Sequence, residues 1–94
     1  MKAQFLLNKK MVVNGAIVEM RGHQTNMEGA VAMIRRLQEL YDKDDGWKLT
    51  HWDEERRGRL LIAFEMEAER DIYGKDERVF FSMARQSEPV RRYR

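Results

Sequence analysis

The segment MVVNGAIV, residues 11–18, decides how the chain begins to fold. An Asn-Gly pair between two apolar runs is the strongest short-range signal for a two-residue β-hairpin. Both loop positions of a type I′ turn need a positive φ, which asparagine tolerates and glycine adopts freely. The sequence therefore predicts a hairpin whose loop is Asn14-Gly15.

A two-residue loop also predicts which residues face each other along the two strands. Continued without interruption, this register places Leu7 opposite Gly22 and leaves one face of the hairpin largely apolar. The other face is polar, except that Val12 and Ile17 form a pair on it near the turn. This exposed apolar pair is a candidate association patch.

An amphipathic helix is predicted after the hairpin. Thr25 and Asn26 are suitable N-caps, and Thr25 with Glu28 matches a capping box. Gly46 is well placed for the exit turn. The apolar positions recur at helical spacing and predict that the helix covers the apolar face of a sheet; they are Met27, Ala30, Ile34, Leu37 and Tyr41.

The second half of the chain alternates in a way that predicts a three-strand meander. A four-residue turn at residues 55–58 places Leu49 opposite Phe64, with His51 on the inner face. The same register places Trp52 and Leu61 on the outer face. A last strand is expected from Val79 to Arg85. The alternation of residues 65–71 predicts a strand with one solvent-exposed face. These residues are also strong helix formers, so a helix there is the alternative.

These elements predict a small α+β domain of order β-β-α-β-β-β, with an antiparallel sheet and one helix packed on one of its faces. The domain is expected to span residues 1–88, and residues 89–94 to form a basic C-terminal tail, because Pro89 cannot donate to a strand ladder. A chain of 94 residues is too short for two independent cores.

The composition disfavours most enzyme chemistries. The chain has no cysteine and only two histidines, so thiolate chemistry is excluded and a metal site lacks convergent ligands. It also has no nucleophile elbow and no glycine-rich phosphate loop. We therefore expect a protein that is not an enzyme and uses no cofactor. The absence of cysteine and of a long apolar run favours the cytoplasm.

The leading functional hypothesis is protein binding through the outer face of the sheet. One helix cannot cover both faces, and the outer face would carry an apolar strip rimmed by charges. We expect the protein to form a homodimer, since small domains often gain stability in that way. Small motif-free domains of this kind are also typical of phage accessory proteins that inhibit a host factor. The candidate interface residues are Val12, Ile17, Trp52, Leu61 and Phe80.

The alternative hypothesis is nucleic-acid binding by aromatic side chains of the sheet and basic residues. Exposed sheet aromatics can stack on bases, and lysines and arginines can contact phosphates. Glu65, Glu67 and Glu69 are expected on that same face and would repel a phosphate backbone. The candidate phosphate contacts are Lys9, Lys10, Arg91, Arg92 and Arg94.

Overall fold

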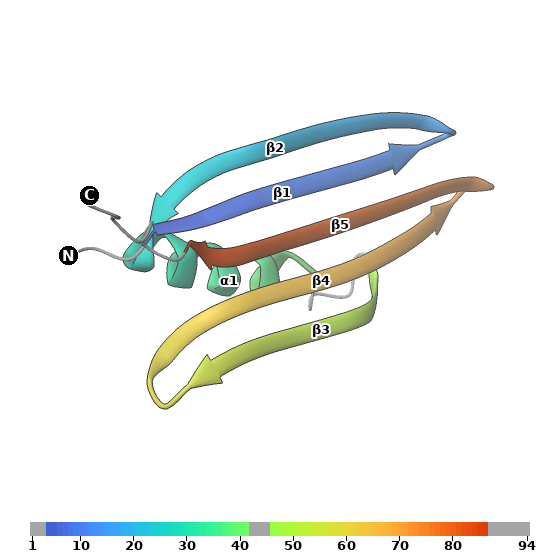
Figure 1. Cartoon of the computed structure of the whole chain (residues 1–94). Helices are drawn as coiled ribbons and strands as arrows, with labels where there is room; N and C mark the ends of the chain where they lie inside the picture. Colours follow the sequence, from blue (N-terminus) through green and yellow to red (C-terminus); the bar gives the residue numbers. More distant parts are fainter. Residues whose placement is uncertain (1–3, 42–45, 87–94) are drawn as a thin grey trace.

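The computed structural model describes residues 4–41 and 46–86 and confirms the α+β fold and the order β-β-α-β-β-β. All strand pairs are antiparallel, and the five strands form one sheet in the order β2-β1-β5-β4-β3 (Figure 1). The elements are β1 (Gln4–Val13), β2 (Ala16–Asn26), α1 (Met27–Tyr41), β3 (Lys48–Arg57), β4 (Leu60–Ile72) and β5 (Lys75–Gln86).

The predicted hairpin at Asn14-Gly15 is confirmed. Asn14 has a φ of 52° and Gly15 a φ of 80°, as both central positions of a type I′ turn require. The β4–β5 hairpin repeats this arrangement at Tyr73-Gly74, with φ values of 56° and 74°. The two turns lie side by side, since the Asn14 backbone N–H donates to the Asp76 carbonyl at 3.4 Å.

The predicted register of β1 and β2 holds only near the turn. Pairing follows the prediction as far as Lys9 opposite Met20, but Leu7 then faces His23 and not Gly22. The extra residue in β2 is Gly22, whose φ of 70° is the left-handed conformation of a glycine bulge. Leu7 therefore keeps its predicted inward direction while its partner changes.

The predicted register of β3 and β4 is wrong. The loop between them is the two-residue turn Gly58-Arg59, with a φ of 61° at Gly58, and β3 runs on to Arg57. Residues 65–71 belong to a strand, as the sequence favoured, and the helical alternative does not occur. The ladder also shifts register twice, between Leu49 and His51 and between Glu55 and Arg56.

These shifts reverse the faces predicted for three residues. Each bulge adds one residue on one strand, and the inward–outward alternation changes phase after it. His51, expected inside, lies on the face without the helix, where its Nε2 is 2.9 Å from Glu65 Oε1. Leu61, expected outside, is 0% exposed. Trp52 also turns inward, and its ring packs edge-on against Phe64 with centroids 4.8 Å apart.

The helix begins where the capping residues predict. Asn26 is the N-cap, and its Oδ1 accepts a hydrogen bond from the Gly29 N–H at 2.9 Å. A Cβ at Gly29 would collide with the Thr25 hydroxyl, so any other residue at that position would require the Thr25 side chain to move. One stripe of the helix is buried against the sheet, through Ala30, Ile34 and Leu37.

The core lies between α1 and one face of the sheet, called here the helix side; the opposite face is called the open face. Its strand residues come from β1, β4 and β5: Phe5, Leu7, Leu61, Phe64, Met66, Ala68, Val79, Phe81 and Met83. The 15-residue helix is about 22 Å long, whereas the 13 residues of β4 extend about 43 Å. The helix therefore leaves the end of the sheet near the two type I′ turns uncovered (Figure 1).

Replacing Gly15 by valine should destabilise the protein through backbone conformation alone. No atom lies within 4 Å of a Cβ built at this position, so there is no clash to relieve. An L-residue in the left-handed region costs about 1–2 kcal/mol, and a β-branched residue is among the worst. Thermal melts of Gly15→Val should show a midpoint lowered by about 5–15 °C. Gly15→Asn, which tolerates positive φ, should melt close to the wild type, and equal losses in both variants would contradict the assigned turn.

The corrected face of Leu61 can be tested against its neighbour in sequence. Leu61 is fully buried, whereas Leu60 is 45% exposed. Leu61→Ala should lower the free energy of unfolding by about 2–5 kcal/mol, because it leaves a cavity in the core. Leu60→Ala should cost about 0.5 kcal/mol or less. Chemical denaturation of both variants measures the difference, and a larger loss for Leu60→Ala would show that the bulge is misplaced.

Candidate functional site at the β2 edge

β2 is an outermost strand of the sheet and carries the most exposed side chains of the fold. Ten of its 11 residues are exposed, and only Thr25 is partly buried. The helix packs close to the end of β2 from which it starts and does not extend over the rest of the strand (Figure 1). The part from Ala16 to Arg21 is called here the β2 edge.

Among the described residues, the backbone of the β2 edge has hydrogen-bonding groups with no strand partner. The residues that flank a two-residue loop form a hydrogen-bonded pair, and such pairs alternate along an antiparallel ladder. Ala16, Val18 and Met20 therefore direct their N–H and C=O groups toward β1. Ile17 and Glu19 direct theirs away from the sheet, where a further strand could pair with them.

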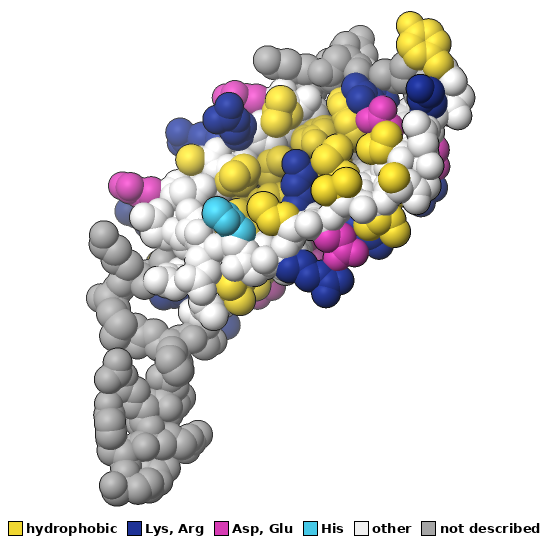
Figure 2. Space-filling view, turned by 90° about the horizontal axis from the view of Figure 1, so that it is seen from above, with side chains coloured by type: hydrophobic (Ala, Val, Ile, Leu, Met, Phe, Trp, Pro, Cys, Tyr) yellow, Lys and Arg dark blue, Asp and Glu magenta, His cyan; other side chains and the backbone are white. Residues whose placement is uncertain are grey.

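The β2 edge has exposed apolar side chains on both faces of the sheet. Ile17 is 56% exposed on the open face, and Val18 and Met20 are 67% and 40% exposed on the helix side. These are three of the six large hydrophobic side chains that are exposed in the described ranges. Viewed from the side on which β2 lies, hydrophobic side chains gather in a broad area over the strands (Figure 2).

β3, the strand at the other edge of the sheet, is protected. It contains a bulge at Thr50, its partner β4 contains a second one at Ile62, and the last five residues of β3, 53–57, are all charged. Glu54 accepts hydrogen bonds from Arg56 Nη2 at 3.0 Å and from Trp52 Nε1 at 3.2 Å. β2 has its one bulge at Gly22, beyond the β2 edge, and its charged residues Glu19 and Arg21 alternate with apolar ones. Comparison of the two edges therefore singles out the β2 edge as the more open to a partner.

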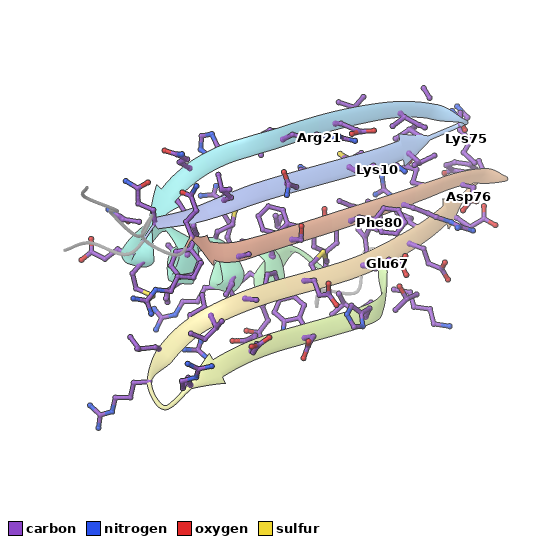
Figure 3. All side chains as sticks on the ribbon, in the orientation of Figure 1. Lys10, Arg21, Glu67, Lys75, Asp76 and Phe80 are labelled. Carbon is purple, nitrogen blue, oxygen red and sulfur yellow. The ribbon has the colours of Figure 1, made fainter. Side chains whose placement is uncertain are left out.

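The open face next to the β2 edge carries a row of side chains that crosses all five strands. From β2 to β3 the paired positions are Glu19, Lys10, Phe80, Glu67 and His51. Lys10 Nζ lies 5.9 Å from the centroid of the Phe80 ring, a cation–π distance. Figure 3 shows Arg21, Lys10, Phe80 and Glu67 on successive strands.

A shallow hollow of about 390 Å³ lies at the β2 end of this row. Arg21 Nε binds Glu19 Oε2 at 2.7 Å on one side of it, and Asn8 Oδ1 accepts a hydrogen bond from the Gly22 N–H at 3.0 Å. The hollow is lined by Asn8, Lys9, Lys10, Glu19, Met20, Arg21, Phe80 and Ser82. Six of these eight residues are polar or charged, and Met20 and Phe80 are apolar.

The structure places three of the five predicted interface residues together. Val12 and Ile17 are partners in the β1–β2 ladder, and Phe80 lies on the same open face in β5. Trp52 and Leu61 do not belong to this surface, since the bulges turn both toward the helix side, where Leu61 is in the core and Trp52 packs against it.

The predicted phosphate contacts do not form one basic patch among the described residues. Lys9 lies on the helix side and Lys10 on the open face, because neighbours in a strand point in opposite directions. Arg91, Arg92 and Arg94 lie outside the described residues. Glu65 and Glu67 lie on the open face, as the sequence predicted.

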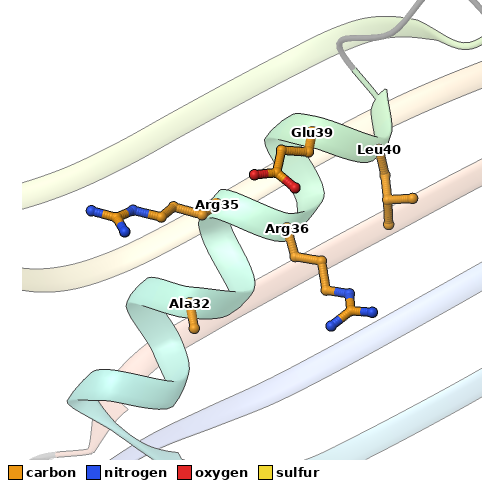
Figure 4. Close-up of a pocket in the computed structure, with 5 residues that line it drawn as sticks. All are labelled: Ala32, Arg35, Arg36, Glu39 and Leu40. Atoms are coloured by element: carbon orange, nitrogen blue, oxygen red, sulfur yellow. The ribbon is translucent and has the colours of Figure 1, made fainter.

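A second depression, of about 400 Å³, lies on the outward side of α1. Its side chains point in different directions and do not converge on a common point (Figure 4). They are Ala32, Arg35, Arg36, Glu39 and Leu40. Within residues 4–41 and 46–86 there is no group of three or more His, Cys, Asp or Glu side chains that could hold a metal ion.

Sequence reasoning missed Val18 and Met20 as surface residues. Their alternation placed them on the apolar face, which was expected to be covered by the helix. The predicted side of the sheet was correct for both residues, but the helix is too short to cover Val18 and Met20. Comparing the length of the helical stripe with the lengths of the strands would have revealed the uncovered end.

Comparison of the chain with protein-family models, curated proteins and solved structures finds no match. In the described part of the chain, no helix has the length and apolar character needed to cross a membrane.

The hydrogen bonds to Glu54 predict a measurable pH dependence. The Arg56 guanidinium and the Trp52 indole N–H lower the pKa of Glu54 below its ordinary value. A lowered pKa in the folded state means that the ionised carboxylate stabilises the fold above the unfolded pKa, and that this contribution is lost as pH falls through the folded pKa. Between about pH 5 and pH 3, the free energy of unfolding should therefore fall more steeply for the wild type than for Glu54→Gln. Denaturation at several pH values measures this, and parallel curves would contradict the assigned contacts.

Proposed function

We propose that this protein is a non-enzymatic binding protein that holds a protein partner at the β2 edge and the adjoining open face. The observation that carries the proposal is the run of exposed apolar side chains on an edge strand with free backbone groups. Binding of this kind requires only backbone hydrogen bonds and apolar contacts, and no reactive group.

Strand addition accounts for the two features of the β2 edge together. An added strand satisfies the outward N–H and C=O groups of Ile17 and Glu19, and its side chains flank those of β2 on both faces. Isolated exposed hydrophobic residues are common on protein surfaces, but consecutive ones on an unprotected edge are a liability in a monomer.

The open face next to the β2 edge supplies apolar area with a polar rim for such a contact. Val12, Ile17 and Phe80 supply apolar area, and charged side chains surround them. Lys10 and Arg21 lie on the β2 side of Phe80, whereas Glu67 lies on the β4 side. This mixture of signs is typical of the rim of a protein interface, and it opposes a phosphate backbone laid across the sheet.

The proposal is tested with two lysine substitutions of the same chemical type. Val18→Lys places a charge on the β2 edge, whereas Leu40→Lys places one on the helix, where Leu40 is 52% exposed. Both variants should fold as the wild type does by circular dichroism. Proteins retained by the immobilised wild type from a lysate of the source organism should be lost with Val18→Lys and kept with Leu40→Lys, as judged by mass spectrometry.

Two outcomes would overturn the proposal. One is that both variants retain the same proteins as the wild type, which would show that the β2 edge is not used. The other is that the wild type retains nucleic acid, detected by its absorbance ratio, and that binding weakens with salt as phosphate contacts require.

A further inference from the structure

We infer that the partner at the β2 edge is a second copy of this chain, with two β2 strands paired antiparallel about a twofold axis at Met20. This inference rests on the proposed use of the β2 edge for binding. It adds the identity of the partner and the register of the pairing, which would join two five-stranded sheets into one.

The backbone restricts where the twofold axis can lie. Ile17 and Glu19 direct their backbone groups away from β1. Arg21 is the next position of the same alternation, because it follows Met20, which pairs with Lys9, and precedes the bulge at Gly22. A symmetric antiparallel pair must bring these outward positions opposite one another. Within the β2 edge, the centres that place at least two of these three positions opposite one another are Val18, Glu19 and Met20. An axis at Ile17 or Arg21 would pair only that one residue with its own copy.

The charges of β2 distinguish these three centres. An axis at Glu19 places two Glu19 carboxylates directly opposite each other, and like charges in that position are destabilising. An axis at Val18 places Glu19 opposite the apolar Ile17 and leaves the charge of Arg21 beyond the pairing. An axis at Met20 places Glu19 opposite Arg21 of the second copy, and by symmetry this favourable pair occurs twice.

The same register suits the helix side of the β2 edge. Met20 would face Met20 of the second copy, and the flexible thioether side chain adapts readily to such a contact. Val18 would face Gly22 of the second copy, where no side chain competes for space. The partly exposed apolar side chains of the two copies would then form one continuous surface.

The ion pair between Arg21 and Glu19 of the same chain does not prevent the two side chains from pairing with the second copy instead. It joins two residues on the same face of one strand at 2.7 Å, with the Arg21 side chain 79% exposed. Exposed pairs of this kind contribute little to stability. In the dimer each group would retain an opposite charge and gain a cross-strand neighbour.

The register is tested by single cysteines, because the chain has none of its own. Val18→Cys, Glu19→Cys and Met20→Cys each place a thiol at one of the three possible centres, and Leu40→Cys is the control on the helix. Directly opposite residues in an antiparallel pair lie within the distance range of a disulfide. Under mild oxidation Met20→Cys should form a covalent dimer much faster than the other three. Fastest crosslinking of Val18→Cys, or equal rates for all four, would overturn the register.

The charge pairing is tested by mixing two variants. Glu19→Arg leaves only positive charges at these positions, and Arg21→Glu leaves only negative ones, so each variant alone should dimerise about tenfold more weakly than the wild type. The mixture should form a heterodimer of near wild-type affinity, measured by sedimentation equilibrium. Effects within one chain cannot produce this rescue, and its absence would refute the Glu19–Arg21 pairing.

Failure of this inference differs from failure of the proposed function. A wild type that is monomeric in light scattering at all accessible concentrations refutes the second copy as partner. If Val18→Lys nevertheless loses a captured protein that Leu40→Lys retains, the β2 edge is used for a different partner. If the wild type is monomeric and Val18→Lys also retains every captured protein, both the inference and the proposed function are wrong.

Discussion

The pairing of β1 with β5 is the interaction on which the rest of the structure depends. It runs without a bulge from Gln4 opposite Gln86 to Val13 opposite Glu77, and it joins the first hairpin to β5. Without it, the hairpin and the meander would be two small sheets with no shared face for the helix. Because the pairing is regular, Leu7 lies beside Met83 in the core and Lys10 lies beside Phe80 on the open face.

The one helix in the described residues then divides the sheet into a covered and an uncovered part. It starts directly after β2 and can cover only its own length of the helix side, which is about half that of β4. Apolar side chains on the same side of the β1–β2 hairpin therefore have different environments. Phe5 and Leu7 are buried, whereas Val18 and Met20 are exposed. The proposed function follows from this mismatch in length, since the uncovered apolar residues lie on an edge strand with unpaired backbone groups.

Local sequence signals predicted the elements well and the faces of the second hairpin poorly. Asn14-Gly15 determines its turn because both residues accept positive φ, and Asn26 begins the helix because its side chain caps Gly29. The faces of Trp52 and Leu61 were predicted from the register of a four-residue turn at residues 55–58 and a ladder without bulges. A two-residue turn at Gly58-Arg59 and two bulges changed that register, and a single inserted residue reverses every side chain beyond it.

The sequence by itself determined the α+β fold class, the element order, the first turn, the helix start and the open-face pair Val12–Ile17, because each rests on residues close together in the chain. Only the tertiary structure decided that Leu61 is in the core, that β3 is the protected edge and that Val18 and Met20 remain exposed. These depend on which strands become neighbours and on how far the helix reaches across them. Both are properties of contacts between residues far apart in sequence, and the alternation within any one strand does not specify them.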